Sequence, residues 1–211
     1  MSRLRYNRKQ AVDILCRQCP SLGRFISSCG PLKLKVARDR DLFNALAAAI
    51  IYQQLSGKAA ATIHGRFCGL FTDQVPEAGQ ATDLAFEDLR AVGLSRNKAL
   101  AVQDLAEKSL NGSLVPMHRM GRLNDEEIME NLCQVRGIGP WTAQMYLIFN
   151  LGRPDVMPSA DLGVQKGVQA VYRLDELPAP EQVADQTAHL APYRSAAAWY
   201  FWRAADTVLM T

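Results

Sequence analysis

With 211 residues, the chain is long enough to bury a substantial core in one domain or in two closely joined lobes. No apolar run approaches the roughly 20 residues that a membrane-spanning helix needs, and the formal net charge of +3 only weakly favours an anionic partner. The five cysteines are scattered and odd in number, which favours reduced thiols in an intracellular protein over a disulfide scaffold.

The first 40 residues have a mixed pattern. Val12, Ile14 and Leu15 predict a short helix, whereas the alternation across Leu32–Val36 is typical of a strand. We interpret this part as a packed N-terminal extension.

From residue 41 onward the pattern is helical almost throughout. Apolar residues recur at the three- and four-residue spacing of amphipathic helices, and Ser56, Ser95 and Ser159 stand where N-caps are expected. We expect roughly nine or ten helices and little strand, so the predicted fold class is mainly all-α.

Two of these helical patterns meet across a Gly-x-Gly hairpin. Asn124 is the predicted N-cap of the first helix with Glu127 as its capping-box partner, and Gly137 suits the left-handed residue that ends it. Gly139 and Pro140 suit the start of the second helix, because the N–H that proline lacks would have no partner there. Such a hairpin can bind phosphate, since the N–H groups that open a helix can point at an anion. The alternative is a turn whose glycines serve packing alone.

A longer string around this hairpin points to a family. Leu132–Ala143, which reads LCQVRGIGPWTA, resembles the hairpin of the helix-hairpin-helix-GPD superfamily of DNA glycosylases. Asp161 lies where that family carries its catalytic aspartate. The resemblance covers about residues 40–205 and is strongest to alkylbase DNA glycosylases of the 3-methyladenine DNA glycosylase II type.

The resemblance implies two helical lobes around a DNA-binding cleft. One lobe would comprise about residues 41–150, and the other about residues 1–40 together with 151–211, without the complete N-terminal β domain of some bacterial relatives. Nothing in the sequence demands more than a monomer. The implied location is the bacterial cytoplasm, in association with the nucleoid, or the nucleus if the source is a eukaryote, with no membrane association.

Asp161 is the predicted catalytic residue. With Ser159 as the N-cap, Asp161 would lie in the first turn of a helix, where the helix dipole favours an ionised carboxylate. Cleavage of an N-glycosidic bond builds positive charge on the sugar, which a fixed carboxylate stabilises while it orients the attacking water. On local sequence alone, an aspartate that only stabilises a helix start is the simpler interpretation; the match to the family favours catalysis.

Trp141 stands where strand-nicking members of the superfamily carry a Schiff-base lysine, and tryptophan cannot form that bond. The resemblance therefore implies a monofunctional enzyme that releases the base and leaves an abasic site. Alkylation at a purine ring nitrogen makes the base a good leaving group, so the implied substrates are 3-methyladenine, 7-methylguanine and related purines in double-stranded DNA.

Aromatic residues are the predicted lining of the base pocket. Trp202 aligns with a pocket tryptophan of the family, and Trp141 and Tyr52 are further candidates. A cationic base over an aromatic face gains about 1–2 kcal/mol of cation–π energy when desolvated. Met145 replaces a tyrosine that is frequent in the family, so the stacking arrangement and the substrate range are left open.

Other segments resemble the family's DNA-contacting parts. Gln54, with Leu55 as second choice, would fill the gap that a flipped nucleotide leaves in the duplex; an ordinary turn with Leu55 in the core is the alternative. Phosphate contacts are assigned to the hairpin and to the segment that opens another basic helix. The DNA-binding residues are therefore predicted to be Gly137, Gly139, Thr142, Ser95 and Lys98.

No required cofactor is expected. Some relatives carry a C-terminal iron–sulfur loop of four cysteines, but no cysteine follows Cys133 in this chain. The resemblance alone suggests a Na⁺ or K⁺ site at the hairpin, formed by the backbone carbonyls of Cys133, Val135 and Ile138. Two other functions stay open: a non-enzymatic module that binds damaged DNA, and a glycosylase for mismatched or oxidised bases.

Overall fold

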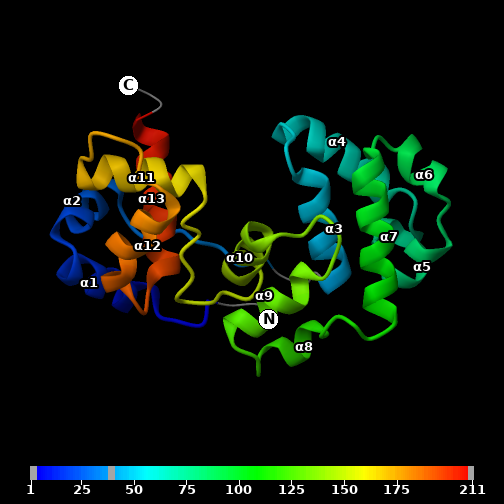
Figure 1. Ribbon diagram of the computed structural model, residues 1–211, viewed down its shortest axis with the longest axis horizontal. Helices are drawn as coiled ribbons and strands as arrows, with labels where there is room; N and C mark the ends of the chain where they lie inside the picture. The colour runs from blue at the N-terminus through cyan, green and yellow to red at the C-terminus, as the bar shows by residue number, and fades with distance from the viewer. Residues whose placement is uncertain (1–3, 38–40, 209–211) are drawn as a thin grey trace. The chain divides into compact units, whose positions relative to one another are not determined.

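The computed structural model describes residues 4–37 and 41–208, and Figure 1 shows its helices. The chain divides into two compact units, unit 1 (residues 1–38 and 144–211) and unit 2 (residues 39–143). All regular elements of the described residues are helices, which confirms the predicted all-α class. None of those helices is both long and apolar enough to cross a membrane.

Unit 2 is built around α7, which packs against α3, α5 and α6 (Figure 1). The buried face of α7 is supplied by small and branched residues such as Ala99, Val102 and Leu105. The elements of this unit are α3 (Leu42–Tyr52), α4 (Gly57–Cys68), the 3₁₀ turn η1 (Thr72–Gln74), α5 (Ala78–Asp83), α6 (Phe86–Ala91), α7 (Arg96–Leu110), α8 (Met117–Met120) and α9 (Asp125–Cys133).

Three predicted N-caps of unit 2 are confirmed. The hydroxyl of Ser56 accepts from the Ala59 N–H at 3.5 Å at the start of α4. The hydroxyl of Ser95 accepts from the Lys98 N–H at 3.3 Å at the start of α7. Asn124 forms a complete capping box at the start of α9, because its side chain and that of Glu127 each accept from the other residue's N–H at 2.8 Å.

Unit 1 centres on α11 and α13, which pack closely on each other. Their contact depends on Gly167, because a Cβ added there would lie 2.0 Å from the backbone oxygen of Phe201. The elements that lie wholly in this unit are α1 (Arg8–Gln18), α2 (Pro20–Cys29), α11 (Leu162–Tyr172), α12 (Pro180–Thr187), the 3₁₀ turn η2 (Ala188–Leu190) and α13 (Arg194–Val208).

The N-terminal predictions are half correct. The helix expected around Val12–Leu15 is present as α1, but Leu32–Val36 forms no strand. The alternation is real, since Leu32 and Leu34 are buried and the lysines between and after them are exposed. The segment has no strand to pair with among the described residues, and Arg8 donates to the Leu34 carbonyl at 2.8 Å instead.

The two units divide within α10 (Pro140–Phe149), between residues 143 and 144. The family resemblance implied a boundary at about residue 150. The second half of α10 belongs with unit 1 because its last residue is held there: the ring of Phe149 stacks on Trp202, and its carbonyl accepts from the Ala37 N–H at 2.7 Å.

Candidate functional site

Asp161 begins helix α11 in unit 1. It is itself the N-cap, with its Oδ1 accepting from the Val164 N–H at 2.9 Å. The prediction that Ser159 caps this helix is wrong, because the chain still turns at that point: Ser159 N–H donates to Met157 O, and Asp161 N–H donates to Pro158 O, both at 2.9 Å. The half-buried carboxylate therefore sits at the positive end of the helix dipole, where negative charge is stabilised.

Trp202 brings a second donor to the same oxygen. From α13, its Nε1–H donates to Asp161 Oδ1 at 2.8 Å. The indole is fixed in turn by Phe149, whose ring stacks on it with centroids 5.6 Å apart and an interplanar angle of 27°. Sequence analysis assigned Trp202 to the base pocket, but its contacts in unit 1 also make it a positioning residue for the carboxylate.

Gly163 makes room for this contact. A Cβ at Gly163 would lie 2.8 Å from Cδ1 of Trp202 and 3.0 Å from Oδ1 of Asp161, closer than ordinary van der Waals contact. Sequence analysis missed this residue. The available signal was Gly163 and Gly167 one turn apart on a single helix, a spacing that lets a second helix approach closely.

The segment that leads to Asp161 is held by the start of α13. Nε and Nη2 of Arg194 donate to the two carboxylate oxygens of Asp155 at 2.8 and 2.9 Å. The buried Ser195 hydroxyl accepts from the Val156 N–H at 2.9 Å. Burial raises the pKa of Asp155, but hydrogen bonds from Arg194 and its charge outweigh that effect and leave the pKa below its usual range. Sequence analysis assigned no role to these residues.

The hairpin lies in unit 2 between α9 and the start of α10. Gly137 has φ +77°, which confirms the predicted left-handed residue, although α9 has already ended at Cys133 and a short turn intervenes. Pro140 is the first residue of α10, as predicted. A Cβ at Gly139 would meet nothing within 4 Å, so the fold of unit 2 does not require glycine there. An approaching ligand remains a reason for it.

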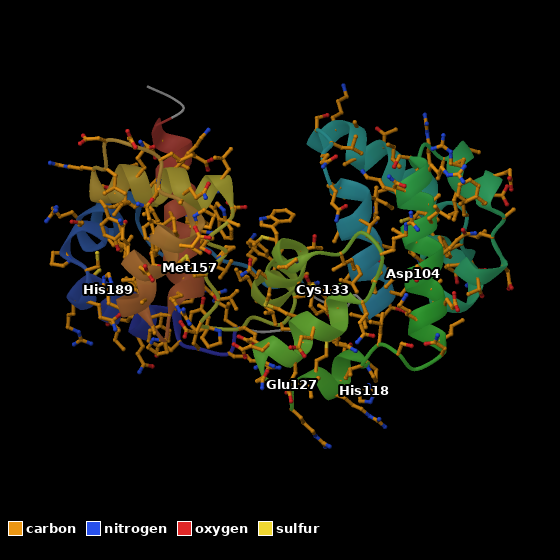
Figure 2. All side chains as sticks on the ribbon, in the orientation of Figure 1. Asp104, His118, Glu127, Cys133, Met157 and His189 are labelled. Atoms are coloured by element: carbon orange, nitrogen blue, oxygen red, sulfur yellow. The ribbon has the colours of Figure 1, made fainter. Side chains whose placement is uncertain are left out.

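Two side chains of unit 2 hold this hairpin through hydrogen bonds. Nε2 of Gln53 donates to the Gly137 carbonyl at 2.9 Å and to the hydroxyl of the buried Thr142 at 3.3 Å. Asp104, which Figure 2 labels on α7, accepts from the Arg136 N–H at 2.7 Å. Burial raises the pKa of Asp104, but the hydrogen bonds from Arg136 and Lys108 and their charges outweigh it, so the pKa is lowered.

The predicted plug residues lie in the turn between α3 and α4. Gln54 is exposed and adopts φ +55°, a conformation uncommon for residues other than glycine. Leu55 is 39% exposed, so the alternative that placed it in the core is wrong. Both side chains are available to a partner.

Lys98, a predicted phosphate contact, has hydrogen-bond partners within unit 2. Its ammonium donates to the carbonyls of Ile51 at 2.8 Å and Gln53 at 2.7 Å, so it satisfies carbonyls at the C-terminal end of α3. Burial lowers its pKa. Ser95, also predicted to bind DNA, uses its hydroxyl as the N-cap of α7.

The two other predicted pocket aromatics are in unit 2. Tyr52 is 44% exposed and Trp141 is 45% exposed. The Tyr52 ring lies 5.9 Å from that of His64. Each ring therefore presents apolar surface to a ligand.

Comparison with known proteins identifies the family. Residues 47–192 match the model of the HhH-GPD superfamily of base excision DNA repair proteins. The chain belongs to this superfamily.

The chain is similar to individual members of the HhH-GPD superfamily. The chain is 38% identical to DNA-3-methyladenine glycosylase 1 of Schizosaccharomyces pombe over 165 residues, 78% of this chain and 72% of that protein. It superposes on a structure of 3-methyladenine DNA glycosylase from the same yeast in complex with abasic DNA, with a TM-score of 0.82, 33% identity and coverage of 92% and 95% of the two chains. For a DNA-3-methyladenine glycosidase from Bacillus halodurans, the TM-score is 0.85 at 30% identity, with coverage of 95% and 91%.

Proposed function

We propose that this protein is a monofunctional DNA glycosylase of base excision repair that releases alkylated purines, 3-methyladenine and 7-methylguanine among them, from double-stranded DNA. The observation that carries the proposal is the carboxylate of Asp161, held on one oxygen by the Val164 N–H and the Trp202 indole. The names of the relatives, which are 3-methyladenine glycosylases, support the substrate class.

Asp161 acts on the sugar. As the bond between C1′ and the base nitrogen breaks, the electron pair leaves with the base and positive charge develops on the sugar ring. A carboxylate held at the start of α11 stabilises that charge and orients the water that attacks C1′. The products are the free base and an abasic site. An alkylated purine leaves readily, because its ring already carries positive charge.

Strand cleavage is not part of the proposed reaction. A lyase step would need an amine that forms a Schiff base with C1′. Trp141, at the position matched to the lysine of strand-nicking relatives, carries no such amine. The DNA strand therefore stays intact until the abasic site is broken by other means.

DNA is engaged by unit 2. The backbone N–H groups of the hairpin at Gly137 and Gly139 bind phosphate, with Thr142 behind them, and Gln54 with Leu55 fills the gap left by the flipped nucleotide. Tyr52 and Trp141 offer faces on which an extruded base can stack. No cofactor takes part, and the protein acts as a monomer.

A Na⁺ or K⁺ ion bound by the hairpin backbone is a further part of the proposal. The proposed ligands are the carbonyls of Cys133, Val135 and Ile138. The Val135 carbonyl accepts from the Ile138 N–H at 3.0 Å, and a carbonyl oxygen has a second lone pair for a cation. The ion would add positive charge where the hairpin meets phosphate.

The test uses duplexes that each carry one defined lesion: 7-methylguanine, 1,N⁶-ethenoadenine, hypoxanthine or 8-oxoguanine. We expect release of 7-methylguanine, no strand break before alkali, and no covalent complex on addition of borohydride. A trapped complex, or a preference for 8-oxoguanine, would favour a lyase-competent enzyme for oxidised bases. Tight binding without release of any base would favour the non-enzymatic module.

A further inference from the structure

In unit 2, Gln53 links the turn that holds the plug residues to the phosphate-binding hairpin. Its side chain reaches across to the hairpin, where Nε2 donates to the Gly137 carbonyl and the Thr142 hydroxyl. Its own carbonyl accepts from Lys98 at 2.7 Å. One residue thus has its backbone in the turn between α3 and α4 and its side-chain hydrogen bonds in the hairpin.

Helix α7 supports both ends of this link. Lys98, Ala101 and Asp104 follow each other at three-residue intervals, which places them near one side of a helix. Lys98 holds the turn through two carbonyls, and Asp104 holds the hairpin through the Arg136 N–H (Figure 2 labels Asp104). Gly137 packs beside Ala101, because a Cβ added at Gly137 would lie 3.4 Å from the Cβ of Ala101.

The residue next to Gln53 needs such support. Gln54 adopts φ +55°, and a non-glycine residue keeps a left-handed backbone only where its surroundings hold it. The contacts that hold it are made by the residues just before it: Lys98 donates to the carbonyls of Ile51 and Gln53, and the Gln53 amide donates to the hairpin. The direction in which the side chains of Gln54 and Leu55 project is therefore set by the hairpin and by α7.

We propose that Gln53 is a positioning residue that couples phosphate binding at the hairpin to insertion of Gln54 and Leu55 into the duplex. When the hairpin binds the DNA backbone, the Gln53 amide places the turn so that Gln54 and Leu55 enter the gap that the flipped nucleotide leaves. The proposal rests on the proposed function in one respect, since it takes the turn as the segment that enters DNA.

Gln53→Met tests the link because methionine keeps the length of the side chain and removes both N–H donors. Gln103→Met is the matched control: Gln103 is a half-buried glutamine of α7 whose side chain makes no hydrogen bond within the described part of the chain. Plug insertion is read from the fluorescence of 2-aminopurine beside a stable abasic-site analogue. Base release is measured in a single turnover.

For Gln53→Met we expect the 2-aminopurine signal to fall to that of a Leu55→Ala variant, with base release about tenfold slower, because reaction rates depend steeply on positioning. Affinity for undamaged duplex and its salt dependence should stay within about twofold, since those report phosphate contacts. The melting temperature should fall by less than about 2 °C, because the amide of Gln53 is partly exposed to water. Gln103→Met should match the wild type.

Combining Gln53→Met with Leu55→Ala separates positioning from mere support. If Gln53 acts through the plug, it has little left to position once Leu55 is truncated, and the double variant should behave like Leu55→Ala alone. Fully additive losses would overturn the proposal, as would a wild-type fluorescence signal in Gln53→Met. A wild-type protein that releases no base would refute the proposed function only, because the fluorescence comparison on the abasic analogue still decides the role of Gln53.

Discussion

Gly163→Ala is the change that most sharply tests the arrangement around Asp161. The new methyl group would stand 2.8 Å from Cδ1 of Trp202 and 3.0 Å from the carboxylate oxygen, so one of them must move. The indole cannot yield easily, since it is stacked on Phe149 and donates to the same carboxylate. The hydrogen bond between Trp202 and Asp161 should therefore lengthen or break.

The effect on stability is modest because two terms oppose each other. Overpacking a tight contact costs about 1–3 kcal/mol, and replacing glycine by alanine in a helix returns up to about 1 kcal/mol. A net loss of about 1–2 kcal/mol lowers the melting temperature of a chain of this size by about 2–8 °C. The effect on catalysis is larger, because a displacement of about 1 Å at a reacting group can cost about 100-fold in rate.

The assay is single-turnover release of 7-methylguanine, well below the melting temperature of each variant. We expect Gly163→Ala to be about 10- to 100-fold slower than the wild type. Gly65→Ala is the control, since Gly65 lies in α4 and a Cβ there would meet nothing within 4 Å. A Gly163→Ala protein that releases base at the wild-type rate would refute the idea that Trp202 and Gly163 fix the carboxylate.

Trp202→Phe keeps an aromatic ring but removes the donor to Asp161, so base release should slow by about tenfold or more in the single-turnover assay. The pKa of Asp155 is lowered in the folded state, so its pairing with Arg194 stabilises the fold above about pH 4 and is lost as the pH falls further; melting curves of Asp155→Asn and the wild type should converge below about pH 4. Gly137 has φ +77°, a conformation that alanine adopts only with strain, so Gly137→Ala should distort the hairpin. Binding to all duplexes should weaken alike in an anisotropy titration, since phosphate contacts carry no sequence information.

Local features of the fold could be predicted from the sequence. The capping box of Asn124 and Glu127, the left-handed Gly137 and Pro140 at the start of a helix all depend on neighbouring residues, and all are present. The start of α11 was misplaced because Ser159 and Asp161 are both good caps, and only the turn formed by the preceding prolyl segment decides between them.

Long-range contacts could not be predicted. The indole of Trp202 reaches Asp161 only because Gly163 lets α13 approach α11. The spacing of Gly163 and Gly167 indicates that some helix can approach closely, but it does not say that Trp202, 41 residues from Asp161, lies on that helix. Likewise, a lysine near a helix start suggests a phosphate contact, yet Lys98 donates to carbonyls 47 and 45 residues away in sequence. The candidate residues were visible in the sequence, whereas the residues that position them were not.

Asp161→Asn tests the central claim most directly. Asparagine keeps the size of the side chain and an oxygen that can cap α11, but it removes the negative charge. Released 7-methylguanine is quantified by chromatography for the wild type and the variant side by side, together with their affinities for abasic-site DNA. We predict that the wild type releases base, whereas the variant loses release by about 100-fold or more and still binds abasic DNA. Release by Asp161→Asn at the wild-type rate would contradict the claim that this carboxylate carries the reaction.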